Sequence, residues 1–230
     1  MRNNVLYAMG AAGGLYLLRN LYIIMNTLPD EAKQGPSYRI FFYHLPPYFT
    51  AVICFLVAAV ASGLYLKNRS WKHDTLAVAC TEVGLAFAAM NLVTGMIWGR
   101  FQWGIWWTWD ARLTSALITW LIYLGYLVLR QAIPDPSERA KNAAVLNIFA
   151  LFAIYFTYKA NEWYRTQHPG PVLTFRTGNS SSIDPAMQSM LYQNLLAFIL
   201  IAAVMVAVRM QLERGQREID SLRREVHSYV

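Results

Sequence analysis

The chain has 230 residues and a formal net charge of +7, and it is 56% hydrophobic but only 14% charged. Soluble domains carry roughly 25% charged residues. Because the apolar residues here are gathered into long blocks, the composition excludes an ordinary soluble domain and favours a lipid bilayer. Two cysteines, both inside apolar blocks, exclude a disulfide framework. The basic residues are explained by membrane orientation, so no nucleic-acid partner is expected.

Six blocks are long and apolar enough to cross a membrane, which requires about 20 residues. They lie at 5–28, 46–66, 75–97, 113–132, 143–160 and 190–209. The first is too long for the apolar part of a signal peptide, so it is expected to be a retained helix. The predicted fold class is therefore all-α, a polytopic protein with six transmembrane helices. We expect a membrane domain over 1–211 and a charged helical tail over 212–230, either solvated or docked to a partner.

An even number of spans places both termini on one side, together with two of the connecting loops. Twelve of the twenty Lys and Arg residues are predicted on that side: Arg2, Lys67, Arg69, Lys72, Arg130, Arg139, Lys141, Arg209, Arg214, Arg217, Arg223 and Arg224. Basic residues favour the cytoplasmic side of a membrane. We therefore expect cytoplasmic termini, with 29–45, 98–111 and 161–189 on the outer side.

The outer segment between the third and fourth blocks is unusually rich in tryptophan. It contains Trp98, Trp103, Gly104, Trp106, Trp107, Trp109 and Asp110. If the segment is helical, a stripe forms at i, i+3, i+4 and i+7 from Trp103, Trp106, Trp107 and Asp110. Such a stripe is a flat aromatic platform that suits a large planar ligand such as haem. The alternative is an anchor that lies in the headgroup layer.

Two histidines are predicted on the same side as the tryptophans. His44 lies at the outer end of the second block and His168 in the third outer segment, and a proline follows each within two residues. Neutral imidazole is a common axial ligand of haem iron, and a following proline restricts the backbone. Either one alone would more often be a surface residue, but beside the platform they form a plausible axial pair. His73 and His227, in the basic loop and the tail, are not expected to ligate.

Arginines on the outer side are candidates for the two propionates of a haem, because Arg pairs with carboxylates in a bidentate manner. Arg39 and Arg112 are favoured, since each lies within a few residues of a proposed haem contact. The other candidates are Arg100, Arg165 and Arg176. For each, the alternative is snorkelling towards the headgroups or contact with a lipid phosphate.

Two ionisable residues lie inside the apolar blocks, Arg19 in the first and Glu82 in the third. Charges in a membrane are costly enough to indicate a role. Helix–helix pairing is the expected role, and a pathway for haem or protons is the alternative.

The run from Trp103 to Ser115 resembles the tryptophan-rich WWD signature of haem-handling membrane proteins, specifically the CcmC family of cytochrome c maturation. Its ending, Trp-Asp-x-Arg-Leu-Thr-Ser, is most similar to CcmC, whereas the larger cytochrome synthases continue differently. A second similar segment runs from Pro29 to Pro46 and contains the first histidine. A third runs from Glu162 to Met187 and contains the second. The resemblance covers most of the chain apart from the tail.

The resemblance implies a protein that presents non-covalent haem b at the periplasmic face of the bacterial inner (plasma) membrane to the haem chaperone CcmE. It implies His44 and His168 as axial ligands of the haem iron, and Trp98 through Asp110 as the platform. It also implies no covalent chemistry of its own, so the chain is not expected to be an enzyme. The implied partners are the ATPase CcmA and the membrane proteins CcmB and CcmD, which together form an ABC transporter complex.

Three other classes of membrane protein are alternatives to a haem-delivery protein. A b-type electron carrier would place paired histidines within facing helices, and none here lies deep in a block. A cytochrome c synthase would need more chain and more histidines. The main alternative is a non-haem membrane subunit of an ABC-type transporter, in which the Trp-rich segment only anchors the protein. That alternative predicts a colourless purified protein.

Overall fold

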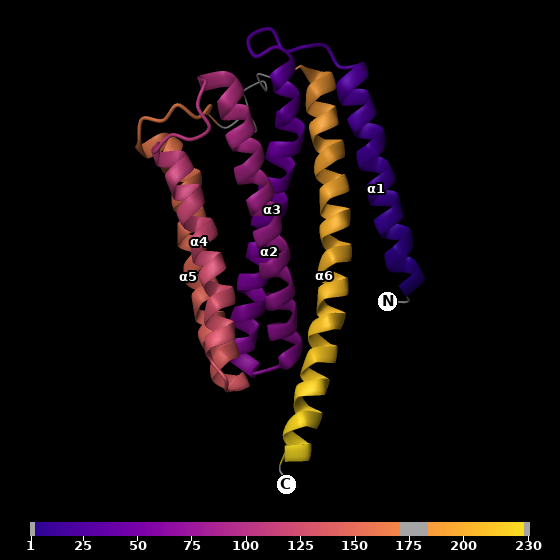
Figure 1. The fold of residues 1–230 in the computed structure, drawn as a ribbon, viewed down its shortest axis with the longest axis vertical. Helices are drawn as coiled ribbons and strands as arrows, with labels where there is room; N and C mark the ends of the chain where they lie inside the picture. The colour runs from indigo at the N-terminus through magenta and orange to yellow at the C-terminus, as the bar shows by residue number, and fades with distance from the viewer. Residues whose placement is uncertain (1–2, 171–183, 228–230) are drawn as a thin grey trace.

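The computed structural model describes residues 3–170 and 184–227 of the chain. Its helices stand side by side in one elongated bundle (Figure 1). They are α1 (Asn3–Asn26), the 3-10 helix η1 (Pro36–Ile40), α2 (Phe41–Asn68), α3 (Trp71–Trp103), α4 (Ala111–Ala132), α5 (Pro136–Trp163) and α6 (Pro185–His227). In the described part of the chain, six helices are long and apolar enough to cross a membrane. The predicted fold class, an all-α multi-pass membrane protein, is confirmed.

Several helices extend beyond the predicted apolar blocks. α2 begins at Phe41, ahead of its two prolines, so His44 lies inside the first turns of the helix. α3 continues to Trp103, and α6 runs without interruption to His227. Hydropathy marks only the lipid-facing middle of a helix, and polar or aromatic ends add turns at either side. The division into a membrane domain and a tail at Leu212 stays a prediction, because one continuous helix crosses that point.

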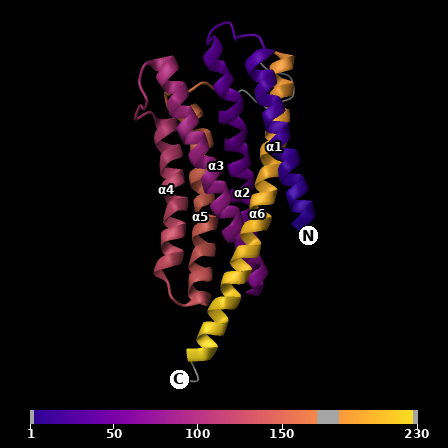
Figure 2. The same ribbon diagram turned by 45° about the vertical axis from the view of Figure 1, so that its right-hand side comes forward.

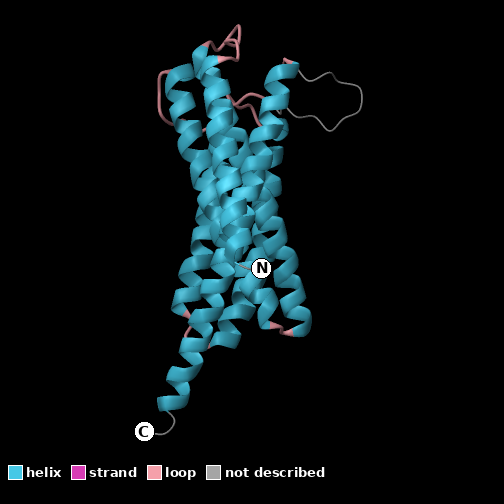
Figure 3. Cartoon of the chain, turned by 90° about the vertical axis from the view of Figure 1, so that its right-hand side faces the viewer, coloured by secondary structure: helices cyan, strands magenta, loops and turns pink. Residues whose placement is uncertain are grey.

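The two ends of the bundle differ. One end carries the loops before α2, between α3 and α4, and between α5 and α6; we call it the histidine end. The other carries the α2–α3 and α4–α5 connections, and we call it the tail end because α6 projects beyond the other helices there (Figure 3). Both chain termini lie away from the histidine end (Figure 1). The side of the membrane that each end faces stays a prediction.

The helices pack as three pairs. α2 pairs with α3 in the middle, α4 with α5 on one side, and α1 with α6 on the other (Figures 1 and 2). The main core cluster joins the middle pair to its neighbours, and there the ring of Phe55 stacks on Tyr123 at 3.6 Å between centroids. α2 also contacts α5 and α6, so it is the element around which the bundle is organised.

The two ionisable residues inside the spans make helix–helix contacts. Arg19 on α1 donates to the side-chain oxygen of Gln193 on α6 at 2.9 Å. Glu82 on α3 pairs with Arg209 on α6 at 2.5 Å. Both contacts join neighbouring helices, which is the role expected for these residues from the sequence.

Candidate functional site

The start of α2 is held in place from α6. Pro46 has no backbone N–H, so the carbonyl of Phe42, four residues earlier, lacks its usual helical donor. The side-chain amide of Asn194 on α6 donates to this carbonyl instead, at 2.9 Å. A buried carbonyl without a donor would be costly, so this bond fixes the turn of α2 that carries His44.

The structure brings His44 and His168 together. Their ring centroids are 6.4 Å apart and their planes are tilted by 42°. Two imidazoles bound to opposite sides of one metal, through bonds of about 2 Å, have centroids roughly 6 Å apart. The pair is therefore spaced to place one iron atom between the two rings.

The ring of His168 is arranged to offer a lone pair. Its Nδ1 lies 2.8 Å from the carbonyl oxygen of Pro169 and donates its proton there, which leaves Nε2 unprotonated in the neutral ring. Burial, and then the charge of Arg112, lower the pKa of His168, and these effects outweigh its hydrogen bond to Pro169 and the nearby Asp110. A lowered pKa favours the neutral ring, which is the form that binds a metal.

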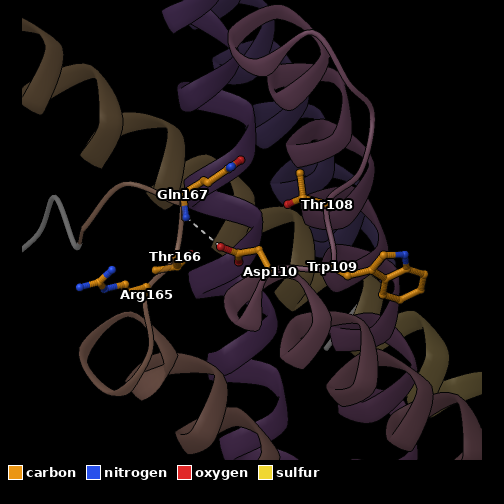
Figure 4. Close-up of a pocket in the computed structure, with 6 residues that line it drawn as sticks. All are labelled: Thr108, Trp109, Asp110, Arg165, Thr166 and Gln167. Atoms are coloured by element: carbon orange, nitrogen blue, oxygen red, sulfur yellow. Dashed lines mark hydrogen bonds between the residues drawn. The ribbon is translucent and has the colours of Figure 1, made fainter.

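Asp110 joins the start of α4 to the loop that carries His168. One carboxylate oxygen accepts from the backbone N–H groups of Arg112 and Leu113, in the first turn of α4, at 2.8 and 3.1 Å. The other accepts from the backbone N–H of Gln167 at 2.8 Å (Figure 4). Burial alone would raise the pKa of Asp110, but these bonds and one from Thr166 lower it overall. The anionic carboxylate thus positions the residue directly before His168.

The condition for a helical tryptophan stripe is not met, because the segment after Trp103 is not helical. α3 ends at Trp103 because Gly104 adopts the left-handed conformation, with φ of +76°, and the chain continues as a loop to Asp110. Trp103 packs edge-to-face on Trp98 at 5.0 Å, and a second edge-to-face pair follows in the loop. Trp109, in that second pair, is 78% exposed. Four of the five tryptophans therefore form two pairs at the rim of the histidine end.

Several buried polar atoms of this region have no hydrogen-bond partner among the described residues. They are Trp107 Nε1, Thr108 Oγ1, Thr114 Oγ1 and Asn161 Oδ1. Buried polar atoms normally find a partner in the protein, in water or in a ligand. One of these residues, Thr108, also lines an open pocket of about 420 Å³, together with Trp109, Asp110, Arg165, Thr166 and Gln167 (Figure 4). The region thus offers both space and polar groups to a ligand.

The two favoured arginines have different surroundings. Arg39 donates to the carbonyls of Ile24 and Leu28 and pairs with Asp30, so it caps the end of α1. Arg112 lies at the start of α4, where it donates to the carbonyl of Thr157 and acts electrostatically on His168. Of these two arginines, only Arg112 is next to the histidine pair.

The remaining arginines and histidines are placed as follows. Arg165 lines the pocket, Arg100 donates to the carbonyl of Gly104, and Arg176 lies outside the described residues. His73 is hydrogen-bonded to Asn68 at the tail end, away from the pair. The side chain of His227 lies outside the described part of the structure.

Sequence reasoning missed two residues beside His44. Asn91 and Thr94 on α3 both lie within hydrogen-bond distance of its ring. A single Asn and a single Thr inside an apolar block belong to no recognisable motif, so only the packing of α3 on α2 identifies them.

The profile of the family described as "Heme exporter protein C" (CcmC) matches residues 1–225. The heme exporter protein C of Bradyrhizobium diazoefficiens is 36% identical over 197 residues, which cover 84% of this chain and 73% of the relative. The protein of that name from Paracoccus denitrificans is 33% identical over 195 residues, which cover 84% of this chain and 80% of the relative. The protein of that name from Escherichia coli K12 is 33% identical over 183 residues, which cover 80% of this chain and 73% of the relative.

Proposed function

This chain belongs to the CcmC family of heme exporter proteins, and on that premise we propose that it binds haem b non-covalently at the histidine end. In this proposal His44 and His168 are the axial ligands of the haem iron. The resemblance to the family found in the sequence is confirmed by the match over residues 1–225. Haem is the cargo of the protein and not a resident cofactor.

The observation that carries the proposal is the separation of the two histidine rings. A centroid distance of 6.4 Å fits one iron with an imidazole on each side. The unpartnered polar atoms and the open pocket support a ligand in the same region. Arg112, beside the pair, is the candidate for a propionate, whereas the capping contacts of Arg39 favour a structural role for that residue.

The function is binding and transfer without a reaction. With a histidine on each side, a haem iron has no open axial position for a substrate or oxygen. Trp106 and Trp109 are 55% and 78% exposed at the rim, where they form an apolar surface for an acceptor protein. We assign to the acceptor the role of the periplasmic chaperone CcmE, which places the histidine end at the periplasmic face of a bacterial inner membrane. CcmA, CcmB and CcmD are the proposed partners in an ABC-type complex.

The test is the visible absorption spectrum of the full chain, purified in detergent from haem-sufficient cells. We expect a Soret band in the parent that shifts or disappears in both His44→Ala and His168→Ala, because each removes one axial ligand. His73→Ala, at the tail end, is the matched control and keeps the parental spectrum. A parent without haem, even with its partners co-expressed, would overturn the proposal and favour a non-haem transporter subunit.

A further inference from the structure

The imidazole of His44 lies against α3 and contacts two consecutive turns of it. Its Nδ1 is 3.1 Å from the backbone carbonyl oxygen of Asn91 and 3.1 Å from the hydroxyl oxygen of Thr94. The side-chain amide of Asn91 donates to the backbone carbonyl of His44 at 2.8 Å. α3 therefore holds both the ring and the backbone of this residue.

These contacts determine which ring nitrogen carries the proton. A carbonyl oxygen can only accept, and the Thr94 hydroxyl donates its proton to the carbonyl of Met90 at 2.8 Å, so a lone pair of its oxygen is available to the ring. The amide nitrogen of Asn91 lies 3.2 Å from Nδ1 and 3.4 Å from Nε2, but its shortest contact is the bond it donates to the backbone carbonyl of His44, at 2.8 Å. With two acceptors at Nδ1, the contacts favour the neutral tautomer that is protonated there and keeps its lone pair on Nε2.

Gly95 provides the space into which the ring fits. A Cβ atom at this position would lie 3.0 Å from Cε1 of His44 and 3.5 Å from Nδ1. The first distance is shorter than ordinary van der Waals contact between carbon atoms. Any side chain at position 95 would therefore push the ring away from α3.

We propose that Asn91, Thr94 and Gly95 form a clamp on α3 that fixes the tautomer and the plane of His44, so that Nε2 is the nitrogen presented to iron. These three are positioning residues, because the group they contact is the histidine. An Nδ1–H bond to an oxygen acceptor orients a metal-binding imidazole and increases the basicity of its other nitrogen. The role of the clamp in haem binding rests on the proposed function, but the tautomer is a property of the ligand-free chain.

The first experiment reads the tautomer without haem. Histidine labelled with nitrogen-15 gives signals from only four residues, and the His44→Gln variant identifies the signals of His44 by their loss. In the ligand-free full chain in detergent, two-bond nitrogen–proton correlations should show His44 protonated at Nδ1. Protonation at Nε2 would overturn the clamp, whatever the protein does with haem.

The second experiment measures how tightly hemin binds and at what potential it is reduced. Thr94→Val removes the hydroxyl acceptor with little change of shape, and we expect it to weaken hemin binding by about 10-fold. The midpoint potential should become more positive, because a less basic imidazole stabilises ferric iron less. Thr94→Ser keeps the hydroxyl and should restore both values. Parental affinity and potential in Thr94→Val would overturn the proposal.

Two glycine variants test the steric part of the clamp without changing the Thr94 hydroxyl. Gly95→Ala should weaken hemin binding because its methyl group displaces the ring, whereas Gly125→Ala on α4, where a Cβ meets nothing within 4 Å, should not. Equal affinities in the two variants would overturn the steric part of the clamp. If the parent binds no hemin, the proposed function fails, and the tautomer measurement alone still decides the clamp.

Discussion

Asp110 combines a helix cap with a loop anchor in a single carboxylate. Its first oxygen accepts from the backbone at the start of α4, and its second holds the N–H of Gln167, next to His168. Asp135 offers a natural comparison, because it caps α5 at the tail end through the N–H of Glu138 at 2.8 Å and has no part in the histidine end.

Replacing each aspartate by alanine should distinguish the effect of capping a helix from the effect of holding the loop that carries His168. Loss of an N-cap costs about 1 kcal/mol, so both Asp110→Ala and Asp135→Ala should lower the free energy of unfolding in detergent. Only Asp110→Ala should also weaken hemin binding, because the loop with His168 loses its acceptor. Hemin titration of both variants checks this, and equal affinities would show that the anchor has no effect on the site.

At the scale of elements, the first turn of α2 depends on an asparagine side chain that supplies the hydrogen bond missing because of a proline. Pro46 removes the helical donor to Phe42, and Asn194 of α6 replaces it. Asn194 also accepts from Asn20 of α1 at 2.9 Å, so one side chain links three helices. The geometry of His44 therefore depends on α6, which carries no proposed ligand.

Asn194→Leu should destabilise the protein by about 1–3 kcal/mol, the typical cost of a buried polar group left unpaired. Pro46→Ala restores a backbone donor to Phe42, so the same substitution should cost less in the Pro46→Ala background. Thermal unfolding of the four proteins of this double-mutant cycle in detergent measures the difference. Identical costs in the two backgrounds would show that Asn194 does not compensate for the proline.

At the scale of the whole molecule, a cluster of charges joins three helices at the tail end. Asp74 on α3 is 3% exposed at its side chain and pairs with Arg130 of α4 at 2.8 Å and with Arg217 of α6. Glu213 of α6 pairs with Arg217 at 3.0 Å and with Arg209 at 2.9 Å. The cluster fixes the direction in which α6 leaves the bundle.

Asp74→Asn would leave two arginines without their central carboxylate. Breaking a buried ion pair costs about 3–5 kcal/mol, and we expect the lower end because Arg217 is 23% exposed. Glu138→Gln, which breaks the exposed pair with Lys141, should cost less than about 1 kcal/mol.

Hydrogen exchange locates the effect of Asp74→Asn within the molecule. The part of α6 from Arg209 onward should exchange faster, while hemin binding at the opposite end of the bundle is kept. Unchanged exchange in this part of α6 would mean that the cluster does not hold the tail.

Much of the fold was predictable because lipid imposes a length and a composition on each span. All six apolar blocks are helices, but their ends were less accessible to sequence reasoning. α2 begins at Phe41, ahead of its prolines, and the contact from Asn194 of α6 to the carbonyl of Phe42 in its first turn is revealed by no local pattern. The helical stripe failed because one residue, Gly104, takes a left-handed conformation and turns the chain into a loop.

The candidate site was partly predictable from residue types. Imidazoles, tryptophans and an aspartate on one side of six spans indicated a haem site, and the structure brings the two imidazoles together. The assignment of Arg39 to a propionate stays a prediction, although its contacts with α1 favour a cap. Those contacts join residues that the sequence does not mark as neighbours.

The sequence by itself determined the membrane environment, the six helices, the family and the residue types at the histidine end, because hydrophobicity and motifs are local properties of the chain. Only the tertiary structure decided that the rings of His44 and His168 lie 6.4 Å apart and that Asn91, Thr94 and Gly95 lie next to the first of them. The physical reason is that hydrogen bonds and steric fit act over a few ångströms between helices. Their partners are therefore set by packing and not by spacing along the chain.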